Sequence, residues 1–338
     1  MSDARFVFLS QEDVVAAGGL DVAATIDVVE EALRLHAVGD TRLPSKSALM
    51  WSDDLGAEET QGRIMAMPAY VGGSIALAGL KWIPSVPSNP ARGLPRGIGL
   101  IVLTDPETGL PVAVMDGTIV SAARTGAVTG VSARRLARAG PRVAAILGAG
   151  VQAGTQLSAL EAVLPSLEQV RVWDIDHERA EAFRERSDRV VPVANAEDAC
   201  RGADVIVAAT MAPEPYVPAA GLGPGSLFCS VSSLDPEISC VEQADLVVCD
   251  LWDHETGHAS RPLARALAAG LISRDKVVEL PDLVAGRHPG RTMDDQRIFS
   301  TPVGLAIEDV AAAARVYRRA VELGIGTELS LWDSPFWV

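Results

Sequence analysis

The sequence predicts an α/β protein in two parts: a domain with a doubly wound parallel sheet and a smaller α+β domain. Two observations carry this prediction. From residue 142 onward, apolar runs rich in Val, Ile and Ala alternate with helical segments, a pattern typical of parallel strands covered on both faces. In addition, a chain of 338 residues, 48% of them hydrophobic, is too long for one ordinary domain and sufficient for two.

The part of the chain before this region reads as a helix followed by antiparallel strands. Residues 21–38 predict an amphipathic helix. The pattern then changes to β over residues 64–117, where Asp105–Gly109 supplies the turn of a hairpin. A helix over about 118–139 follows. Near the other end, residues 302–325 predict a long amphipathic helix that returns the chain to the first domain.

The parallel region begins with two strand and helix units. RVAAILGAG and VRVWDID are the predicted strands, and VQAGTQLSALEAVL and HERAEAFRERS are the helices that follow them. The buried strand runs DVIVAAT, SLFCSV and DLVVCD come next. Strands separated by helices in this way predict a doubly wound sheet.

A glycine-rich turn joins the first of these strands to its helix. Residues 148–153 read GAGVQA, a GxGxxA loop, and the next strand ends in Asp174, at the distance expected for a carboxylate that binds a ribose. Gly148 makes the tight turn, Gly150 lets the backbone approach a pyrophosphate, and the helix N-terminus attracts the phosphates. This context predicts a Rossmann domain that binds NAD rather than NADP, because Asp174 repels a 2′-phosphate. A glycine turn without a ligand is the alternative.

Further residues complete the predicted cofactor site. Asp176, two residues after Asp174, is predicted to cap the next helix instead of binding the ribose. The remaining residues assigned to the cofactor are Val151, Gln152, Thr210, Ser232 and Ser300.

Basic residues of the first domain lie in unusual surroundings. Lys81 is one of three lysines and sits in an apolar strand, LAGLKWI, where an ammonium without a counter-ion is costly to bury. Arg124, in VSAARTGAVTG, lies on a helix among small residues that would let a ligand approach closely. The alternatives are a solvated residue on an exposed strand face for Lys81 and a solvated loop cation for Arg42 in TRLPSK.

Several segments in one order resemble the ornithine cyclodeaminase and mu-crystallin family. They are MPAY, the Lys of LKWI, ETGLPVAVMDG, SAARTGAVTG, ILGAGVQA and GLAIEDVAAA, and they run from about residue 40 to about residue 320. By position, the resemblance implies that Arg42, Lys81 and Arg124 hold a substrate carboxylate and that Gly148, Gly150 and Asp174 bind the dinucleotide. It also implies a homodimer whose first domain supplies the subunit contact.

One position departs from the cyclodeaminase pattern. Cyclodeaminases carry an Asp after the fifth strand of the nucleotide domain, in a sequence like VGGDxPG, whereas the corresponding segment here is CSVSSLDPEIS. Ungapped comparison puts Leu234 at that place, and Leu cannot take a proton from an amine. Asp235, one residue later, is therefore the first candidate for the base, and Lys81 with a pKa lowered by burial is the second.

A narrower branch of the family fits better. The runs AGLKWIPSVPSNPARGLPRG, CDLWDHETGHAS and PGRTMDDQRIFS resemble the N-(2-amino-2-carboxyethyl)-L-glutamate dehydrogenase branch, which makes 2,3-diaminopropionate for siderophores and peptide antibiotics. Its PRAS-like motif is matched here only by Pro95 and Arg96. That substrate carries several carboxylates, so Arg96 beside Lys81 suits it. Arg92 is either a further contact or a solvated loop residue.

Composition and charge exclude other classes of function. A formal net charge of -15 argues against nucleic acid and against anionic membranes, because both are bound through Lys and Arg. The four cysteines show no CxxC spacing, and neither a signal segment nor a membrane span is visible, so we expect a cytoplasmic protein. His254 and His258 stand four residues apart, but loop residues and Gly257 weaken a helical metal site. We expect no metal.

These observations combine into one expected function. We expect residues 1–117 to form the substrate-binding and dimerisation domain, 118–303 the NAD-binding domain, and 304–338 the returning helix. The expected reaction is NAD-dependent oxidation of an amino-acid-derived amine to an imine that water hydrolyses. The alternatives are a cyclodeaminase or imine reductase of the same fold, and a dinucleotide- and ligand-binding protein without activity.

Overall fold

The computed structural model describes residues 3–51, 62–257, 259–302 and 304–336. The chain divides into two compact units, which we describe separately. Unit 1 contains residues 1–21, 38–124 and 305–338, and unit 2 contains residues 22–37 and 125–304.

Unit 1 is built on a mixed sheet. Its strands are β1 (Ala4–Leu9), β2 (Thr41–Arg42), β3 (Ser47–Trp51), β4 (Gly62–Val71), β5 (Leu77–Ser85), β6 (Leu100–Thr104), β7 (Pro111–Asp116) and β16 (Thr327–Trp332). Within the described residues they lie in the order β16-β1-β7-β6-β5-β4-β2, with β3 paired to β4. β1 and β7 are parallel, and the other pairs are antiparallel.

The predicted hairpin joins β6 to β7. The Asp105 amide donates to the Leu110 carbonyl at 2.9 Å, and the Gly109 amide donates to the Asp105 carbonyl at 2.8 Å. Gly109 has a positive φ of 74°, a conformation that costs glycine little. The turn prediction is therefore confirmed.

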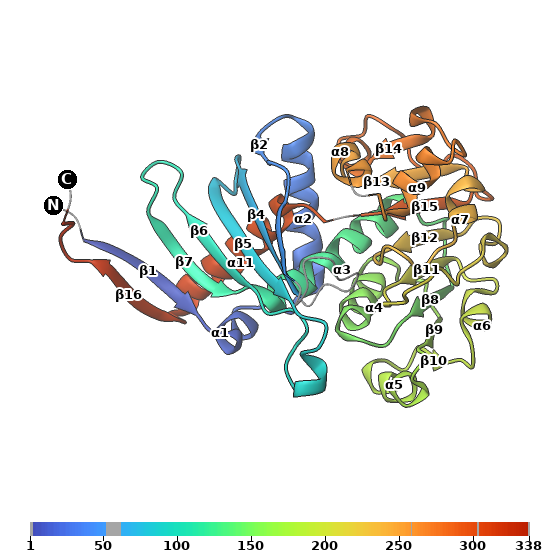
Figure 1. The fold of residues 1–338 in the computed structure, drawn as a ribbon, viewed down its shortest axis with the longest axis horizontal. Helices are drawn as coiled ribbons and strands as arrows, with labels where there is room; N and C mark the ends of the chain where they lie inside the picture. The colour runs from blue at the N-terminus through green and yellow to red at the C-terminus, as the bar shows by residue number, and fades with distance from the viewer. Residues whose placement is uncertain (1–2, 52–61, 258, 303, 337–338) are drawn as a thin grey trace. The chain divides into compact units, whose positions relative to one another are not determined.

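One long helix, α11 (Ala306–Leu323), covers one face of this sheet (Figure 1). It contacts β4, β5 and β6, and its bounds fall inside the predicted range of 302–325. Gly79 on β5 permits the close approach, because a Cβ at this position would lie 3.0 Å from Val310 Cγ2. This packing brings a segment from the end of the chain onto the strand that carries Lys81.

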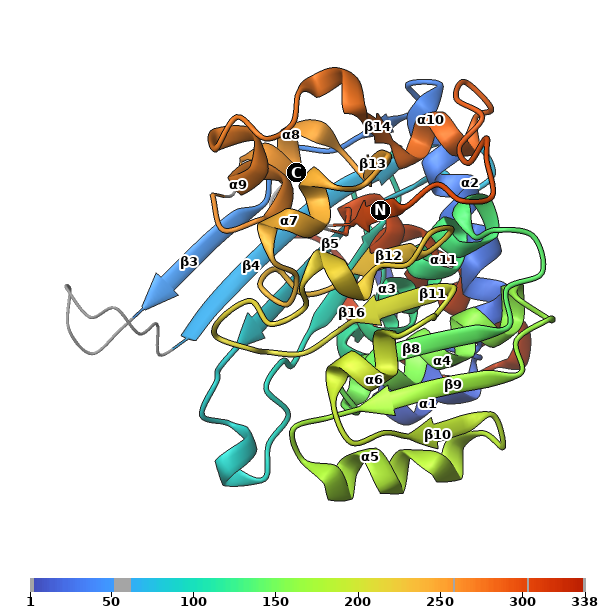
Figure 2. The same cartoon turned by 90° about the vertical axis from the view of Figure 1, so that its right-hand side faces the viewer.

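Unit 2 contains the predicted doubly wound sheet, seen in Figure 2. Its strands are β8 (Val143–Leu147), β9 (Gln169–Trp173), β10 (Val190–Pro192), β11 (Val205–Ala208), β12 (Leu227–Ser230), β13 (Leu246–Cys249), β14 (Val277–Glu279) and β15 (Ile298–Thr301). The order is β10-β9-β8-β11-β12-β15-β13-β14, and these pairs are all parallel. The predicted fold class is confirmed.

Helices complete unit 2. They are α2 (Val22–Ala37), the greater part of α3 (Gly117–Leu136), α4 (Val151–Val163), α5 (His177–Phe183), α6 (Ala196–Cys200), α7 (Ile238–Glu242), α8 (Trp252–Thr256), α9 (Pro262–Ala268) and α10 (Leu280–Val284).

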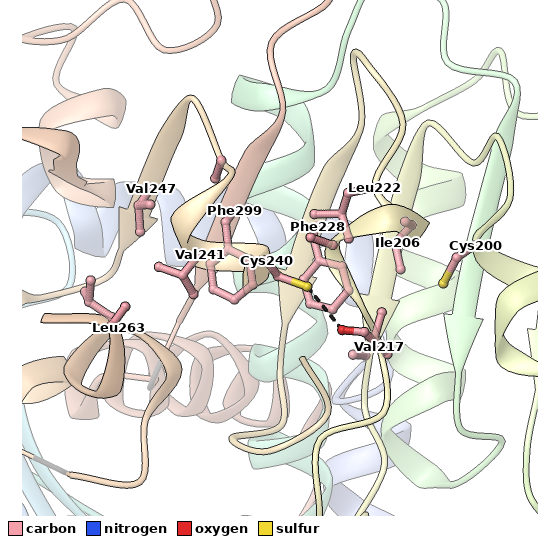
Figure 3. Packing of buried hydrophobic residues seen from close by; sticks show 14 of the residues in the cluster. Cys200, Ile206, Val217, Leu222, Phe228, Cys240, Val241, Val247, Leu263 and Phe299 are labelled. Atoms are coloured by element: carbon pink, nitrogen blue, oxygen red, sulfur yellow. Dashed lines mark hydrogen bonds between the residues drawn. The ribbon is translucent and has the colours of Figure 1, made fainter. Parts of the chain in front are cut away.

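The core of unit 2 lies between the sheet and the helices of one face (Figure 3). Phe228 and Phe299, on neighbouring strands, stack with ring centroids 5.3 Å apart. The Cys240 thiol donates to the Val217 carbonyl at 3.2 Å, and burial raises its pKa to about 12. All four cysteines are free and buried, which makes them packing residues rather than reactive thiols.

The division into units differs from the predicted boundaries in two places. Helix α2 belongs to unit 2, not to the first 117 residues, because its buried Ile26 packs on α3. A Cβ at Gly130 would lie 2.6 Å from Ile26 Cδ1, so α2 needs a glycine there. The second difference is residues 118–124, which group with unit 1 although they follow residue 117.

The described residues contain neither a membrane-spanning helix nor a cluster of metal ligands. No helix in that part of the chain is long and apolar enough to cross a bilayer. Nor does any group of three or more His, Cys, Asp and Glu side chains gather there as a metal site would require.

Candidate functional site

The glycine loop of unit 2 lies where a parallel sheet binds nucleotides. The strand order reverses between β8 and β11, which are adjacent and parallel, and ligands bind beyond the carboxyl ends of strands at such a point. Gly148 directly follows β8, and Thr210 lies two residues beyond β11. The structure therefore brings these two predicted residues to the same edge of the sheet.

The shape of the loop depends on its glycines. Gly148 has a φ of +102°, and a Cβ there would lie 3.0 Å from the Ala209 carbonyl oxygen and 3.3 Å from Thr210 Cγ2. Gly150 is the N-cap of α4 and offers no side-chain cap, and a Cβ on it would meet no atom within 4 Å. The amides of the first turn of a helix of 13 residues are thus left to a ligand, as in anion-binding helices.

Asp174 is tied to this loop. Its Oδ2 accepts a hydrogen bond of 2.8 Å from the Ala149 amide, and its Oδ1 accepts one of 2.9 Å from the Asp176 amide. Asp176 caps α5, as predicted, by accepting from the amides of Glu178 and Arg179. The predicted ribose carboxylate therefore lies against the glycine turn.

Buried polar atoms without partners add to the fit with a dinucleotide. Ser232 Oγ and Gln152 Oε1 are two of the buried side-chain atoms that have no hydrogen-bond partner among the described residues. Such atoms are rare in folded proteins unless a ligand or water satisfies them. Ser300 differs, because it is buried in β15 and its hydroxyl lies 3.2 Å from that of Ser132.

Asp235 occupies a structural position in unit 2. Its side chain is fully buried, its Oδ2 accepts from the Thr210 amide at 3.0 Å, and its Oδ1 accepts from the Thr210 hydroxyl. Its carbonyl also accepts from the amides of Tyr216 and Val217 at 3.0 Å each. These contacts hold the segment after β11 against the segment after β12.

A buried ionic cluster lies in unit 1. The side chain of Lys81, on β5, is among the most buried in the chain, with 1% of the residue exposed. Its Nζ donates to Asp309 Oδ1 at 2.8 Å and to Ser121 Oγ at 3.2 Å. Burial therefore rules out the alternative of a solvated strand residue.

Arg124 joins the same cluster from α3. Its Nη1 lies 3.1 Å from Glu308 Oε2, and its Nε lies 2.9 Å from Asp309 Oδ1. Glu308 and Asp309 are both fully buried in the first turn of α11. The cluster of Lys81, Arg124, Glu308 and Asp309 thus pairs two cations with two carboxylates.

The surroundings of Lys81 lower its proton affinity. Burial, as the largest cause, and the Arg124 charge together lower the pKa of the Lys81 ammonium from 10.5 to about 8, although Asp309 acts in the opposite direction. An amine with this pKa exchanges protons near neutral pH, unlike an exposed lysine.

A protein-family model for the ornithine cyclodeaminase/mu-crystallin family matches residues 6–324. The chain belongs to this family. Its members include the N-((2S)-2-amino-2-carboxyethyl)-L-glutamate dehydrogenase of Staphylococcus aureus, which is 33% identical over 336 residues, covering 97% of this chain and 99% of the relative. The family resemblance inferred from the sequence motifs is confirmed.

Two solved structures show the same fold. The Delta(1)-pyrroline-2-carboxylate reductase of Thermococcus litoralis, in complex with NADH and L-proline, has a TM-score of 0.86 and 30% identity, covering 95% of this chain and 99% of its own. An archaeal alanine dehydrogenase dimer with bound NAD also has a TM-score of 0.86, with 31% identity, covering 97% of this chain and 100% of its own.

The other arginines that we considered for substrate binding in this chain lie in unit 1. Arg42 is exposed, and its Nη1 donates to the Gly39 and Thr41 carbonyls at 2.8 and 2.7 Å. Arg96 is half-buried, and its Nε lies 3.3 Å from Ser85 Oγ. Arg92 is exposed at the end of a short 3-10 helix.

The structure describes one of the two histidines that stand four residues apart. His254 lies on α8 and is half-buried, whereas His258 falls outside the described residues. The structure therefore describes no distance between the two histidines, and the expectation of no metal stays a prediction.

Sequence reasoning missed Glu308 and Asp309. Both stand in GLAIEDVAAA, a segment used for the family resemblance without any role for its acids. The available signal was the pair itself, because two adjacent carboxylates in an otherwise small and apolar helix must be paired or exposed. A buried Lys81 also required a counter-ion, which Asp309 supplies.

Proposed function

We propose that this chain is an NAD-dependent dehydrogenase that oxidises the amine of an amino-acid-derived substrate. The observation that carries the proposal is the buried cluster of Lys81, Arg124, Glu308 and Asp309. A buried lysine with a lowered pKa, held among charged side chains, is typical of a catalytic site. The relatives named above, which are dehydrogenases or reductases, support the same class of reaction.

In the proposed enzyme, unit 2 binds the cofactor NAD. The amides that follow Gly150, at the start of α4, would bind the pyrophosphate, and Asp174 would accept from the ribose hydroxyls. Ile175, 89% exposed, offers an apolar surface for the adenine. The orphaned atoms of Ser232 and Gln152 support further contacts.

Charge at Asp174 should decide between the two dinucleotides. We expect Asp174→Asn to narrow the preference for NAD over NADP by roughly ten- to hundred-fold, because a carboxylate repels the 2′-phosphate. Asparagine keeps an oxygen for the Ala149 amide, so the loop should persist. The measurement is the Kd of each dinucleotide by titration calorimetry. Asp176→Asn, which keeps the cap of α5, should leave the ratio unchanged, and tighter NADP binding by the unaltered protein would contradict the assignment.

The reaction balances as follows. NAD, when bound, accepts a hydride from the substrate Cα. The amine nitrogen loses a proton to a base, and the C–N single bond becomes an imine. Water then adds to the imine carbon and the C–N bond breaks, which gives a 2-oxo acid and an amine.

We assign the base role to Lys81 and the carboxylate role to Arg124. Neutral Lys81 accepts the amine proton, and its contacts to Ser121 and Asp309 fix its Nζ. A guanidinium carries five N–H donors in a planar fork that matches the geometry of a carboxylate, which suits Arg124 to this role. Asp235, with both oxygens on Thr210, is assigned a structural role instead of the first-choice base role that its sequence position predicted.

The substrate that we propose is N-(2-amino-2-carboxyethyl)-L-glutamate, with 2-oxoglutarate and 2,3-diaminopropionate as products. The Staphylococcus aureus relative supports it. Arg42 and Arg96, both in unit 1, would add to Arg124 the positive charge that a substrate with several carboxylates needs. Reduction of a cyclic imine is the second candidate, favoured by the similarity to the Thermococcus litoralis reductase.

We also propose that two copies pair through the sheet of unit 1. Residues on the face away from α11 are apolar and aligned in register: Leu100 pairs with Trp82, and Val102 pairs with Leu80 and Val114. Trp82 and Leu100 are 40% and 41% exposed. An exposed apolar face of this kind is typical of an interface, and the archaeal alanine dehydrogenase is a dimer.

Trp82→Asp should separate the dimer. A carboxylate at the centre of an apolar interface cannot be desolvated without a partner, so we expect a monomer at micromolar concentration by sedimentation velocity. Met293→Asp, at an exposed residue of unit 2, is the matched control and should leave the mass unchanged. A dimer that persists in the Trp82 variant would place the interface on another face.

The experiment that tests the proposed function is a substrate panel. The purified protein is incubated with NAD and a series of amino acids and carboxyalkyl amino acids, and NADH absorbance is followed. A dehydrogenase accumulates NADH with at least one amine. A cyclodeaminase consumes its substrate without net NADH, and a binding protein does neither.

A further inference from the structure

We propose that Asp309 is a positioning residue that orients both Lys81 and Arg124 and stabilises the ammonium form of Lys81, while the adjacent Glu308 acts on Arg124. The inference deepens the proposed function, because it explains how the base of that reaction is held. It assigns different tasks to two neighbouring carboxylates of α11.

The geometry separates the two carboxylates. Asp309 Oδ1 lies 2.8 Å from Lys81 Nζ and 2.9 Å from Arg124 Nε. Glu308 Oε2 lies 3.1 Å from Arg124 Nη1. One oxygen of Asp309 therefore fixes both cations, so a change at this residue displaces the two groups together.

The groups that face Lys81 act on its charge in known directions. Arg124 from α3 and Lys46 from the segment between β2 and β3 both lower the pKa of Lys81, as burial does, whereas Asp309 from α11 raises it. Glu308, next to Asp309, contacts Arg124. Removing the charge of Asp309 should therefore lower the pKa of Lys81, because no carboxylate charge on Asp309 would then oppose the effects of burial and of the two cations.

The isosteric variant Asp309→Asn isolates the charge. Asparagine keeps the oxygen that accepts from Lys81 and lies beside Arg124 Nε. Its amide takes the place of Asp309 Oδ2, which is buried without a hydrogen-bond partner among the residues described here. The substitution thus removes a charge without removing the acceptor. Glu308→Gln is the matched control at the neighbouring position.

The chain suits a direct measurement, because it contains three lysines, Lys46, Lys81 and Lys276. Protein labelled with ¹³C-lysine gives one ε-methylene signal for each, assigned by replacing each lysine with methionine. The signals are followed through a pH titration of the folded protein without substrate. We expect Lys81 to titrate near pH 8 in the unaltered protein, and about one to three pH units lower in Asp309→Asn.

Three outcomes decide the proposal. A lower midpoint in Asp309→Asn with a smaller change in Glu308→Gln supports it. An unchanged midpoint in Asp309→Asn, or an equal shift in Glu308→Gln, overturns it. If Asp309→Asn does not fold, Asp309→Ser leaves room for water beside the cations and must show the same downward shift.

Kinetics supply a second and separate test. In Asp309→Asn the acid limb of the kcat/KM profile should move to lower pH with the Lys81 midpoint, whereas Glu308→Gln should raise KM with the limb in place. Asp309→Glu, which restores the charge, should return the limb toward that of the unaltered protein. A shifted Lys81 midpoint without amine oxidation would leave Asp309 as proposed and refute the dehydrogenase.

Discussion

Lys81→Met is expected to lower turnover by at least about hundred-fold while the Kd for NAD stays unchanged. General bases contribute roughly 10²- to 10⁴-fold, and methionine fills a similar volume without accepting a proton. Asp309 keeps Arg124 as a partner, so the substitution leaves no isolated buried charge. The measurement is kcat, together with the dinucleotide Kd. Lys276→Met, at a lysine of unit 2 that donates to the Glu242 carbonyl, should retain full activity.

The pH dependence follows from the same group. Lys81 accepts a proton only in its neutral form, so activity should rise as pH increases through about 8.

Arg124→Gln should act differently from Lys81→Met, because it removes a charge-assisted bond worth about 1.5–3 kcal/mol, or roughly ten- to hundred-fold in KM. Normal turnover in both variants would show that the carboxylate and the base lie elsewhere.

L-Ornithine is expected to give little or no proline and ammonia with this protein. Ungapped comparison of the sequence predicts that Leu234, a half-buried apolar residue, takes the place of the catalytic Asp of cyclodeaminases, and the side chain of its neighbour Asp235 accepts from Thr210. We therefore expect this position to lack the group that would handle water and the second amine of ornithine. The measurement is proline and ammonia after incubation with NAD, with a known cyclodeaminase as positive control. Efficient conversion would overturn the choice of branch and leave the NAD loop standing.

Local signals predicted the cofactor loop well. The glycine turn, its helix and Asp174 lie within one strand, helix and strand unit, so spacing along the chain fixes their proximity. The same holds for the parallel strands, whose apolar runs are unlike those of the antiparallel sheet. Asp176 as a helix cap is another local prediction that the structure confirms.

Contacts between distant segments could not be predicted in this way. Lys81 and Asp309 are 228 residues apart, and Arg124 and Glu308 are 184 apart. The sequence alone therefore indicated the two cations and the cost of burying them. It did not indicate the carboxylates that pair with them. Asp235 contacts Thr210, 25 residues earlier, in the same way, and this contact is the reason why we propose a structural role for Asp235 in place of the predicted base role.

The assignment of α2 illustrates a third limit. The amphipathic pattern of residues 21–38 predicted the helix but not the surface that it covers. The glycine opposite Ile26 decides that surface, and only the packed structure shows that Gly130 lies there.

The most direct test of the account is the oxidation of N-(2-amino-2-carboxyethyl)-L-glutamate with NAD, with NADH followed by absorbance and the products identified by mass spectrometry. We expect one NADH for each 2-oxoglutarate and each 2,3-diaminopropionate formed, and loss of all three products in Lys81→Met. Absence of NADH with this substrate, combined with proline formation from ornithine without net NADH, would contradict it.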